Sequence, residues 1–228
     1  MSISQNLNNI KSSLPEHVTL VAVSKTKPNA DILEAYEAGQ RVFGENYVQE
    51  LVEKQEQLPN DIQWHFIGHL QSRKAKLIAP FVSLIHGVDS LKLLQEINKQ
   101  AQKNNRVIDC LLQVHIADEE TKFGLDEKEL EEILKQLLDS ARSDNNVFKN
   151  VRVVGLMGMA TFTEDQNQIK KEFEYLKSLF DKYSKLNTDN WQLNTLSMGM
   201  SGDYELAISC GSTMVRIGSS IFGTRNYQ

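Results

Sequence analysis

Residues 19–28 read Thr19-Leu20-Val21-Ala22-Val23-Ser24-Lys25-Thr26-Lys27-Pro28. This stretch decides the fold, and it contains Lys25, the most informative residue of the chain. Residues 20–23 are all apolar, which predicts a buried strand over residues 19–25 that ends on a lysine. A helical pattern follows from about Asn29, where we expect the helix to be capped, and stops near Gly39. A buried strand followed at once by a helix is the repeating unit of parallel sheets.

The same unit recurs along most of the chain. Seven further strands are expected at residues 41–44, 64–68, 84–88, 109–116, 153–159, 193–198 and 214–217, each followed by a helix or, at the end, a short tail. Ile3, Leu7, Ile10 and Leu14 recur at helical spacing and predict an amphipathic helix before the first strand. Eight units predict an α/β fold, a single (β/α)8 TIM barrel over residues 1–228 with an extra N-terminal helix. An open doubly wound sheet is the competing fold, but its Gly-rich dinucleotide-binding turn is missing after the first strand.

Composition narrows the class of protein. The chain has 228 residues, 40% of them hydrophobic and 24% charged, and a net charge of -5, which argues against a nucleic-acid binder with a broad basic surface. The two cysteines, Cys110 and Cys210, have no metal-like spacing, so we expect no metal site and a reducing compartment, with a disulfide between them as the alternative. No signal peptide and no apolar run of about 20 residues is evident, which predicts a cytoplasmic protein without a membrane span.

Lys25 is the candidate nucleophile. Its charge is costly at the end of a core strand, and a lysine that sheds its proton becomes an amine able to form a Schiff base. Val21, Val23 and Lys25 share one face of the strand, so Lys25 points into the barrel mouth if the valines face the interior. Lys27 is expected to be a charge at the rim. A strand-end lysine that merely extends to solvent is the alternative interpretation of Lys25.

Small polar residues follow the last two strands, where barrels of this type often bind phosphate. Ser201, Ser219 and the backbone N–H groups of Gly218 and Ser219 are the candidate donors. Alternatively, Ser201 only caps a short helix that runs to about Ser209, and the glycines only make tight turns. Arg216 lies on the last strand and must meet an acceptor, either in a structural ion pair or in a ligand.

The histidines are weaker signals. His65 and His115 could line the barrel mouth, although a lone strand histidine is more often a hydrogen-bonded core residue, and His17 and His86 are interpreted as structural. No nucleophile–base–acid order can be argued from the sequence.

Several motifs run in order along the chain: Ala22-Val23-Ser24-Lys25-Thr26-Lys27-Pro28, Phe43-Gly44-Glu45-Asn46-Tyr47-Val48-Gln49-Glu50, Trp64-His65-Phe66-Ile67-Gly68, Lys122-Phe123-Gly124, Gly155-Leu156-Met157, Gly199-Met200-Ser201, Gly211-Ser212-Thr213-Met214-Val215-Arg216-Ile217-Gly218 and Ile221-Phe222-Gly223. Together they resemble the YggS/PROSC family of pyridoxal-phosphate homeostasis proteins, which have the fold-type III barrel of the alanine racemase N-terminal domain. His115 stands where the family usually has Asn, and His69 precedes Leu70 where Pro is frequent.

The resemblance implies that pyridoxal 5'-phosphate (PLP) is the cofactor and that Lys25 holds it as a Schiff base. It also implies that Ser201, Gly218 and Ser219 hold the phosphate, that Arg216 faces the pyridine nitrogen, and that Asn46 contacts the cofactor. An arginine donates to an unprotonated ring nitrogen, which leaves the ring a weak electron sink.

A non-catalytic PLP protein of vitamin B6 homeostasis is therefore expected, with PLP and apo-forms of PLP enzymes as partners. Related alanine racemases add a second, all-β domain that supplies an opposing base, whereas this sequence stops at Gln228, so we also expect a monomer. A PLP-dependent amino-acid racemase is the alternative, and an aldolase that uses Lys25 on a sugar phosphate is the third hypothesis. Lys27 and Lys122 are candidates for a part in cofactor release or a second cofactor site.

Overall fold

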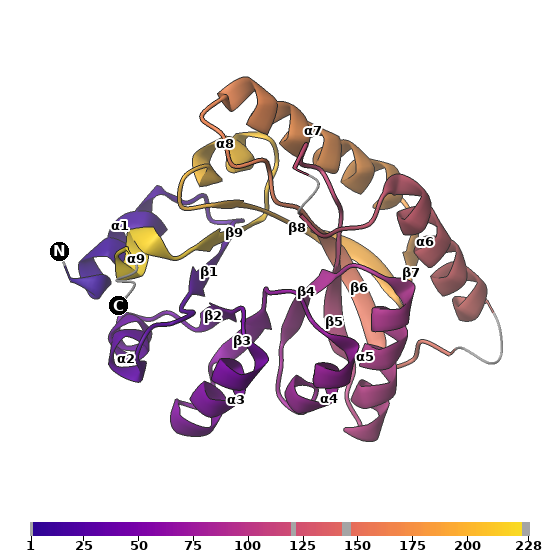
Figure 1. Ribbon diagram of the computed structural model, residues 1–228, viewed down its shortest axis with the longest axis horizontal. Coiled ribbons are helices and arrows are strands. Elements are labelled where there is room, and N and C mark those ends of the chain that lie inside the picture. Colours follow the sequence, from indigo (N-terminus) through magenta and orange to yellow (C-terminus); the bar gives the residue numbers. More distant parts are fainter. Residues whose placement is uncertain (1, 120–121, 143–146, 225–228) are drawn as a thin grey trace.

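Eight parallel strands close into a barrel in the computed structural model, which describes residues 2–119, 122–142 and 147–224 (Figure 1). The strands are β1 (Thr19–Val23), β2 (Val42–Glu45), β3 (Gln63–Phe66), β4 (Leu84–Val88), β5 (Ile108–Gln113), β6 (Val151–Met157), β8 (Trp191–Met200) and β9 (Met214–Ile217). β1 pairs with both β2 and β9, and β6 pairs with β8, so no edge of the parallel sheet is left open. The predicted (β/α)8 barrel is confirmed.

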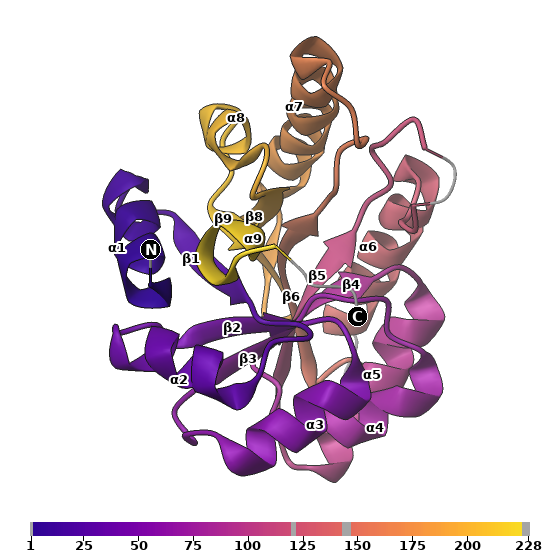
Figure 2. The same ribbon diagram turned by 60° about the vertical axis from the view of Figure 1, so that its left-hand side comes forward.

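Helices cover the outside of the barrel (Figure 1). They are α2 (Asn29–Glu37), α3 (Val48–Gln57), α4 (Ala75–Ile78), α5 (Leu91–Lys103), α6 (Glu127–Ala141), α7 (Gln166–Tyr183) and α8 (Tyr204–Ser209). The predicted N-terminal helix is α1 (Ile3–Ser13), which begins with a capping box formed by Ser2 and Gln5 and buries Leu7 and Ile10. It packs against α9 (Ser219–Phe222), as the turned view in Figure 2 also shows.

Two apolar clusters stabilise the barrel. The larger cluster lies between the strands and the helices and includes Phe66, Leu51 and Phe173. The smaller one fills the barrel interior and consists of Val21, Leu84, Leu111, Val154, Met157 and Met214. Because Val21 is in this interior cluster, the face of β1 that leads to Lys25 is the inward face, as the alternation predicted.

Four local features differ from the sequence expectation. β1 ends at Val23, two residues before Lys25, so Lys25 lies on a turn rather than on the strand. A two-residue strand, β7 (Asn187–Thr188), pairs antiparallel with the start of β8 across a tight polar turn that resembles a loop in sequence. The helix after β3 is a 3-10 turn, η1 (Ser72–Lys74), followed by the one-turn α4, which stops two residues before Pro80. The expected tail after β9 begins with the short helix α9.

None of the helices in the described part of the chain is both long and apolar enough to span a bilayer.

Candidate functional site

A cavity of about 580 Å³ lies at the carboxyl ends of the strands. All six residues that the sequence analysis assigned to the cofactor line it, namely Lys25, Asn46, Ser201, Arg216, Gly218 and Ser219. Lys27 and Lys122 line it too. The fold thus brings together residues from β1, β2, β8 and β9 that are far apart in the sequence.

Lys25 lies on a tight turn that leaves β1. The Ser24 N–H donates to the Gly44 carbonyl at 3.0 Å, and the Lys27 N–H donates to the Ser24 carbonyl at 3.0 Å. Thr26 has a φ of +62°, a left-handed conformation that is uncommon for a residue other than glycine. Such backbone strain persists only where surrounding contacts hold it, which is the case here.

A buried polar cluster holds this turn from beneath, and we name it the Lys54 cluster: Ser24, Thr26, Glu45, Glu50 and Lys54. The Lys54 ammonium donates to the Ser24 carbonyl at 2.8 Å and to Glu45 and Glu50 at 2.7 Å each. Glu45 accepts from the Ser24 hydroxyl at 2.6 Å, and Glu50 accepts from the Thr26 N–H at 2.6 Å. Both neighbours of Lys25 in the chain are therefore anchored.

Two charges of the Lys54 cluster, those of Glu45 and Lys54, are almost fully desolvated. Glu45 has no exposed surface and Lys54 is 5% exposed. Burial raises the pKa of the Glu45 carboxyl, and the charge of Lys54 opposes that rise. The sequence analysis missed this cluster. A detectable signal exists, because Lys54 occupies a core-facing position between Leu51 and Leu58 on its helix.

Asn46 follows β2 and carries an unsatisfied acceptor. Its side-chain oxygen is buried, and among the described residues it has no hydrogen-bond partner. A buried acceptor of this kind costs free energy unless a donor reaches it. Gly68 permits the close approach of the Asn46 backbone, because a Cβ there would lie 2.2 Å from the Asn46 carbonyl oxygen.

The loops after β8 and β9 meet at the predicted phosphate corner. The Ser201 hydroxyl accepts from the Gly218 N–H at 3.2 Å, which joins the two loops. Ser201 is not a helix cap, in contrast to the alternative interpretation: the residue before α8 is Asp203, which accepts from the Met200 N–H at 2.5 Å. Ser219 begins α9.

Arg216 is buried with neutral acceptors. Its guanidinium donates to the Ser197 carbonyl at 2.9 Å, to the Ser197 hydroxyl at 2.6 Å and to the Gly158 carbonyl at 3.1 Å. No ion pair joins it to a carboxylate among the residues that the structure describes. Burial lowers the pKa of Arg216 to about 10, so the guanidinium stays protonated at neutral pH. Arg216 is thus a fixed donor at the floor of the cavity.

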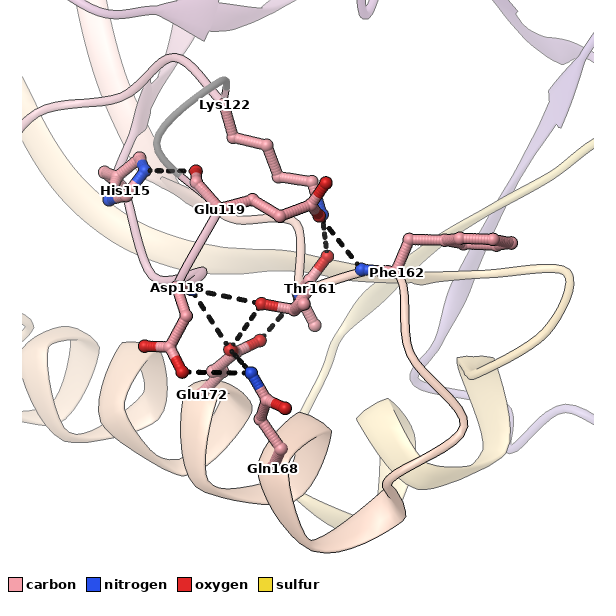
Figure 3. Close-up of polar contacts among 9 residues, drawn as sticks. His115, Asp118, Glu119, Lys122, Thr161, Phe162, Gln168 and Glu172 are labelled. Carbon is pink, nitrogen blue, oxygen red and sulfur yellow. Dashed lines mark hydrogen bonds and ion pairs between the residues drawn. The ribbon is translucent and has the colours of Figure 1, made fainter.

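One wall of the cavity consists of the loops after β5 and β6, which two carboxylates join (Figure 3). Glu172 on α7 is buried and accepts from the Thr161 N–H and hydroxyl, both at 2.7 Å, and from the Asp118 N–H at 3.3 Å. Glu119 accepts from the Phe162 N–H at 3.0 Å and pairs with Lys122 at 2.7 Å.

Two lysines of the cavity bind backbone carbonyls at its rim. Lys27 donates to the Phe222 carbonyl at 2.9 Å, and Lys122 donates to the Ala160 carbonyl. These contacts place Lys27 at the rim, as predicted.

Neither histidine proposed for the mouth lines the cavity within the described residues. His115 contacts the Glu119 carbonyl at 3.0 Å and supports the loop (Figure 3). His65 is buried inside the barrel, where its Nδ1 atom lies 3.1 Å from Nε2 of His86, so the expectation of a mouth residue is wrong for His65. The His86 ring in turn contacts the Ser197 hydroxyl at 3.2 Å.

A family model described as "Alanine racemase, N-terminal domain" matches residues 1–226. The chain belongs to this family. The match spans nearly the whole sequence, so the barrel and its cavity lie within the family region.

Relatives within this family are similar over most of their length, from 77% of the human relative to 99% of the Pasteurella multocida relative. The chain is 40% identical to the pyridoxal phosphate homeostasis protein of Pasteurella multocida, covering 100% of this chain and 99% of the relative. It is 41% identical to the protein of the same name from Escherichia coli K12, covering 93% of this chain and 88% of the relative. The human protein of that name is 42% identical over 91% of this chain.

Solved structures agree with the fold. PipY of Synechococcus elongatus PCC7942 is 36% identical, and its structures without and with bound PLP superpose with TM-scores of 0.89 and 0.86 over 97% of this chain and 100% of theirs. The alanine racemase of E. faecalis is 14% identical with a TM-score of 0.73, and the chain spans 58% of its length, which shows a shared barrel fold alone.

Proposed function

We propose that this chain is a PLP-binding protein of PLP homeostasis and that it holds PLP as a Schiff base on Lys25. The single observation that carries the proposal is the cavity, which gathers an anchored lysine, a fixed arginine donor and a corner of small polar residues. Relatives at about 40% identity are named for PLP homeostasis, and PipY has been solved with PLP bound.

The residues present fit the chemistry of PLP. When bound, PLP supplies an aldehyde and an electron-accepting ring. The amine of Lys25 bonds to the aldehyde carbon, and water leaves. The hydroxyls of Ser201 and Ser219 and the Ser219 N–H donate to the phosphate, while the Gly218 N–H, which donates to Ser201, holds that hydroxyl in place. The unsatisfied oxygen of Asn46 accepts from a ligand hydroxyl.

Arg216 decides how reactive the bound ring is. Its pKa of about 10 keeps the proton on the guanidinium, so Arg216 donates a hydrogen bond to the ring nitrogen without giving up the proton. An unprotonated ring nitrogen stabilises a carbanion weakly. The site is therefore suited to holding PLP rather than to turning over amino acids.

We propose further that the protein is not an enzyme. A racemase needs acid–base groups on both faces of the reacting carbon. Among the described residues that line the cavity there is no tyrosine and no histidine, and Lys27 and Lys122 are held by backbone carbonyls. We propose apo-forms of PLP enzymes as recipients of the cofactor, and we propose that the protein is a monomer. We also propose a cytoplasmic location, in keeping with the free thiols of the buried Cys110 and Cys210.

Absorbance spectroscopy with borohydride trapping tests the proposal. The purified protein with added PLP is expected to develop a yellow near-visible band, and borohydride is expected to fix the cofactor onto a peptide that contains Lys25. Lys25→Ala is expected to abolish the band, while the control Lys27→Ala keeps it. A protein that stays colourless with added PLP would overturn the proposal and favour the aldolase hypothesis.

Two further assays distinguish a carrier of PLP from a PLP-dependent enzyme. Stoichiometric transfer of PLP to an apo-enzyme is expected, and retention of PLP in every transfer assay would contradict delivery. Steady formation of the opposite amino-acid enantiomer, lost in Lys25→Ala, would establish a racemase instead.

A further inference from the structure

A chain of polar side chains crosses the barrel interior beneath the cavity. His65 on β3 contacts His86 on β4 at 3.1 Å, His86 contacts the Ser197 hydroxyl on β8 at 3.2 Å, and that hydroxyl accepts from Arg216 on β9 at 2.6 Å. All four residues are buried, with exposed fractions of 5% or less. We name them the interior chain. Buried polar groups of this kind are costly unless every member is satisfied.

Arg216 fixes the direction of the hydrogen bonds in the interior chain. A guanidinium has no acceptor, so the Ser197 oxygen must accept from it. Within the described part of the chain, the Ser197 hydroxyl has one other side-chain neighbour, the Nδ1 atom of His86, so the hydroxyl proton points there. The Nδ1 atom of His86 is therefore an acceptor, and the His86 proton is on Nε2.

The same reasoning fixes the position of the proton on the His65 ring. The Nε2–H of His86 donates to Nδ1 of His65, so the proton of His65 is also on Nε2. With this direction both rings are neutral, because a charged His86 would leave the Ser197 hydroxyl proton without an acceptor among its described side-chain partners. Burial lowers the pKa of His65 to about 3 and lowers that of His86 strongly, and the charge of Arg216 adds to the effect on His86.

We infer that His86 and Ser197 are positioning residues that aim the Arg216 guanidinium at the cavity through a one-directional chain of hydrogen bonds. Ser197 and the Gly158 carbonyl engage the guanidinium nitrogens on the interior side. Because Arg216 also lines the cavity, those of its N–H groups that bond to none of the described residues are available to a ligand. The role of Arg216 toward the cofactor's ring nitrogen rests on the proposed function. The direction of the hydrogen bonds in the interior chain does not depend on it.

Nitrogen-15 NMR of histidine-labelled protein without cofactor tests the direction. His65 and His86 are both expected as neutral rings with the proton on Nε2, and both are expected to stay neutral down to about pH 5. A proton on Nδ1 of His86, or a charged His86 at neutral pH, would overturn the inference whether or not the protein binds PLP.

The substitution Ser197→Ala tests the positioning role. It is expected to weaken PLP binding roughly tenfold and to move the nitrogen-15 signal of the labelled cofactor's ring nitrogen. Ser212→Ala is the matched control, because Ser212 is a similarly buried serine whose hydroxyl, within the described residues, donates to backbone carbonyls of the same region.

Two outcomes separate positioning from general packing. If Ser197→Ala and Ser212→Ala have the same effect on the ring-nitrogen signal, the positioning role is wrong. If Ser197→Ala does not fold, Ser197→Thr keeps the hydroxyl and is expected to restore the signal of the unaltered protein, and failure to do so would contradict the role. Failure of the unaltered protein to bind PLP would refute the proposed function but leave the NMR test of the chain decisive.

Discussion

The substitution Lys54→Met removes the positive charge of the Lys54 cluster while roughly keeping the volume of the side chain. It leaves Glu45 without its cation in a site that has no solvent exposure, and it removes the donor from the Ser24 carbonyl at the start of the Lys25 turn. Glu50, which is 22% exposed, can regain water, so the main loss falls on Glu45.

Breaking a buried ion pair by removing one partner costs about 3–5 kcal/mol of unfolding free energy. Burial already raises the pKa of Glu45, and loss of Lys54 raises it further, because the lysine was opposing the rise. A folded-state pKa above the unfolded value means that the folded protein binds the extra proton. The stability from Glu45 is then greatest at low pH and is lost as the pH rises through the folded pKa. The loss of unfolding free energy caused by Lys54→Met is therefore expected to be larger at about pH 8 than at about pH 5.5.

Urea unfolding of both proteins at the two pH values measures this deficit. Two controls sharpen it: Lys182→Met removes an exposed ion-paired lysine and is expected to change little, and Glu45→Gln added to Lys54→Met is expected to recover much of the loss. A deficit below about 1 kcal/mol, or one that is independent of pH, would refute the idea that Lys54 neutralises a desolvated carboxylate.

Three further predictions concern the site and its supports. Gly68→Ala places a Cβ 2.2 Å from the Asn46 carbonyl oxygen and is expected to cost at least about 2 kcal/mol in urea unfolding and to weaken PLP binding, whereas an unchanged affinity would contradict the placement of Asn46. Glu172→Gln is expected to speed proteolytic cleavage near Phe162, because the amide accepts the loop N–H groups less strongly, and an unchanged cleavage rate would count against the role of Glu172 in the cavity wall. The unfolding free energy is expected to fall as the pH drops from about 6.5 toward 3, by up to about 1.4 kcal/mol per pH unit from His65, because only the unfolded chain binds that proton. Urea unfolding of His65→Gln checks this, since the variant should lose that part of the slope.

The barrel could be predicted because its signal repeats. Each strand is a short apolar run, and each is followed by a helix whose apolar positions recur at helical spacing, so local patterns and the global fold agree. The alternation of side chains along β1 predicted that Lys25 continues the inward face of that strand. The polar residues after β8 and β9 could be predicted to lie near Lys25, because parallel strands end at the same rim of the barrel.

The supporting contacts could not be predicted in the same way. The contact of His65 with His86 depends on the register of the adjacent strands β3 and β4, in which His65 lies opposite Leu84, and no local pattern encodes that register. Lys54 reaches Ser24 across 30 residues of sequence, and the register of β1 and β2 sets that contact. The role of Asp203 before α8 was missed because Ser201 is an equally good cap by residue type.

The pairing of β1 with β9 also sets when the site can exist during synthesis. Val21 lies opposite Arg216 in the closed barrel, although the two are separated by almost the whole length of the chain. At about 5–20 residues per second, the ribosome adds Arg216 roughly 10–40 s after Lys25. Until then β1 lacks β9, one of its two neighbouring strands, and the site lacks the residues of the loop after β9. The pocket that Lys25 lines is therefore incomplete in the emerging polypeptide until nearly all of its strands have been made.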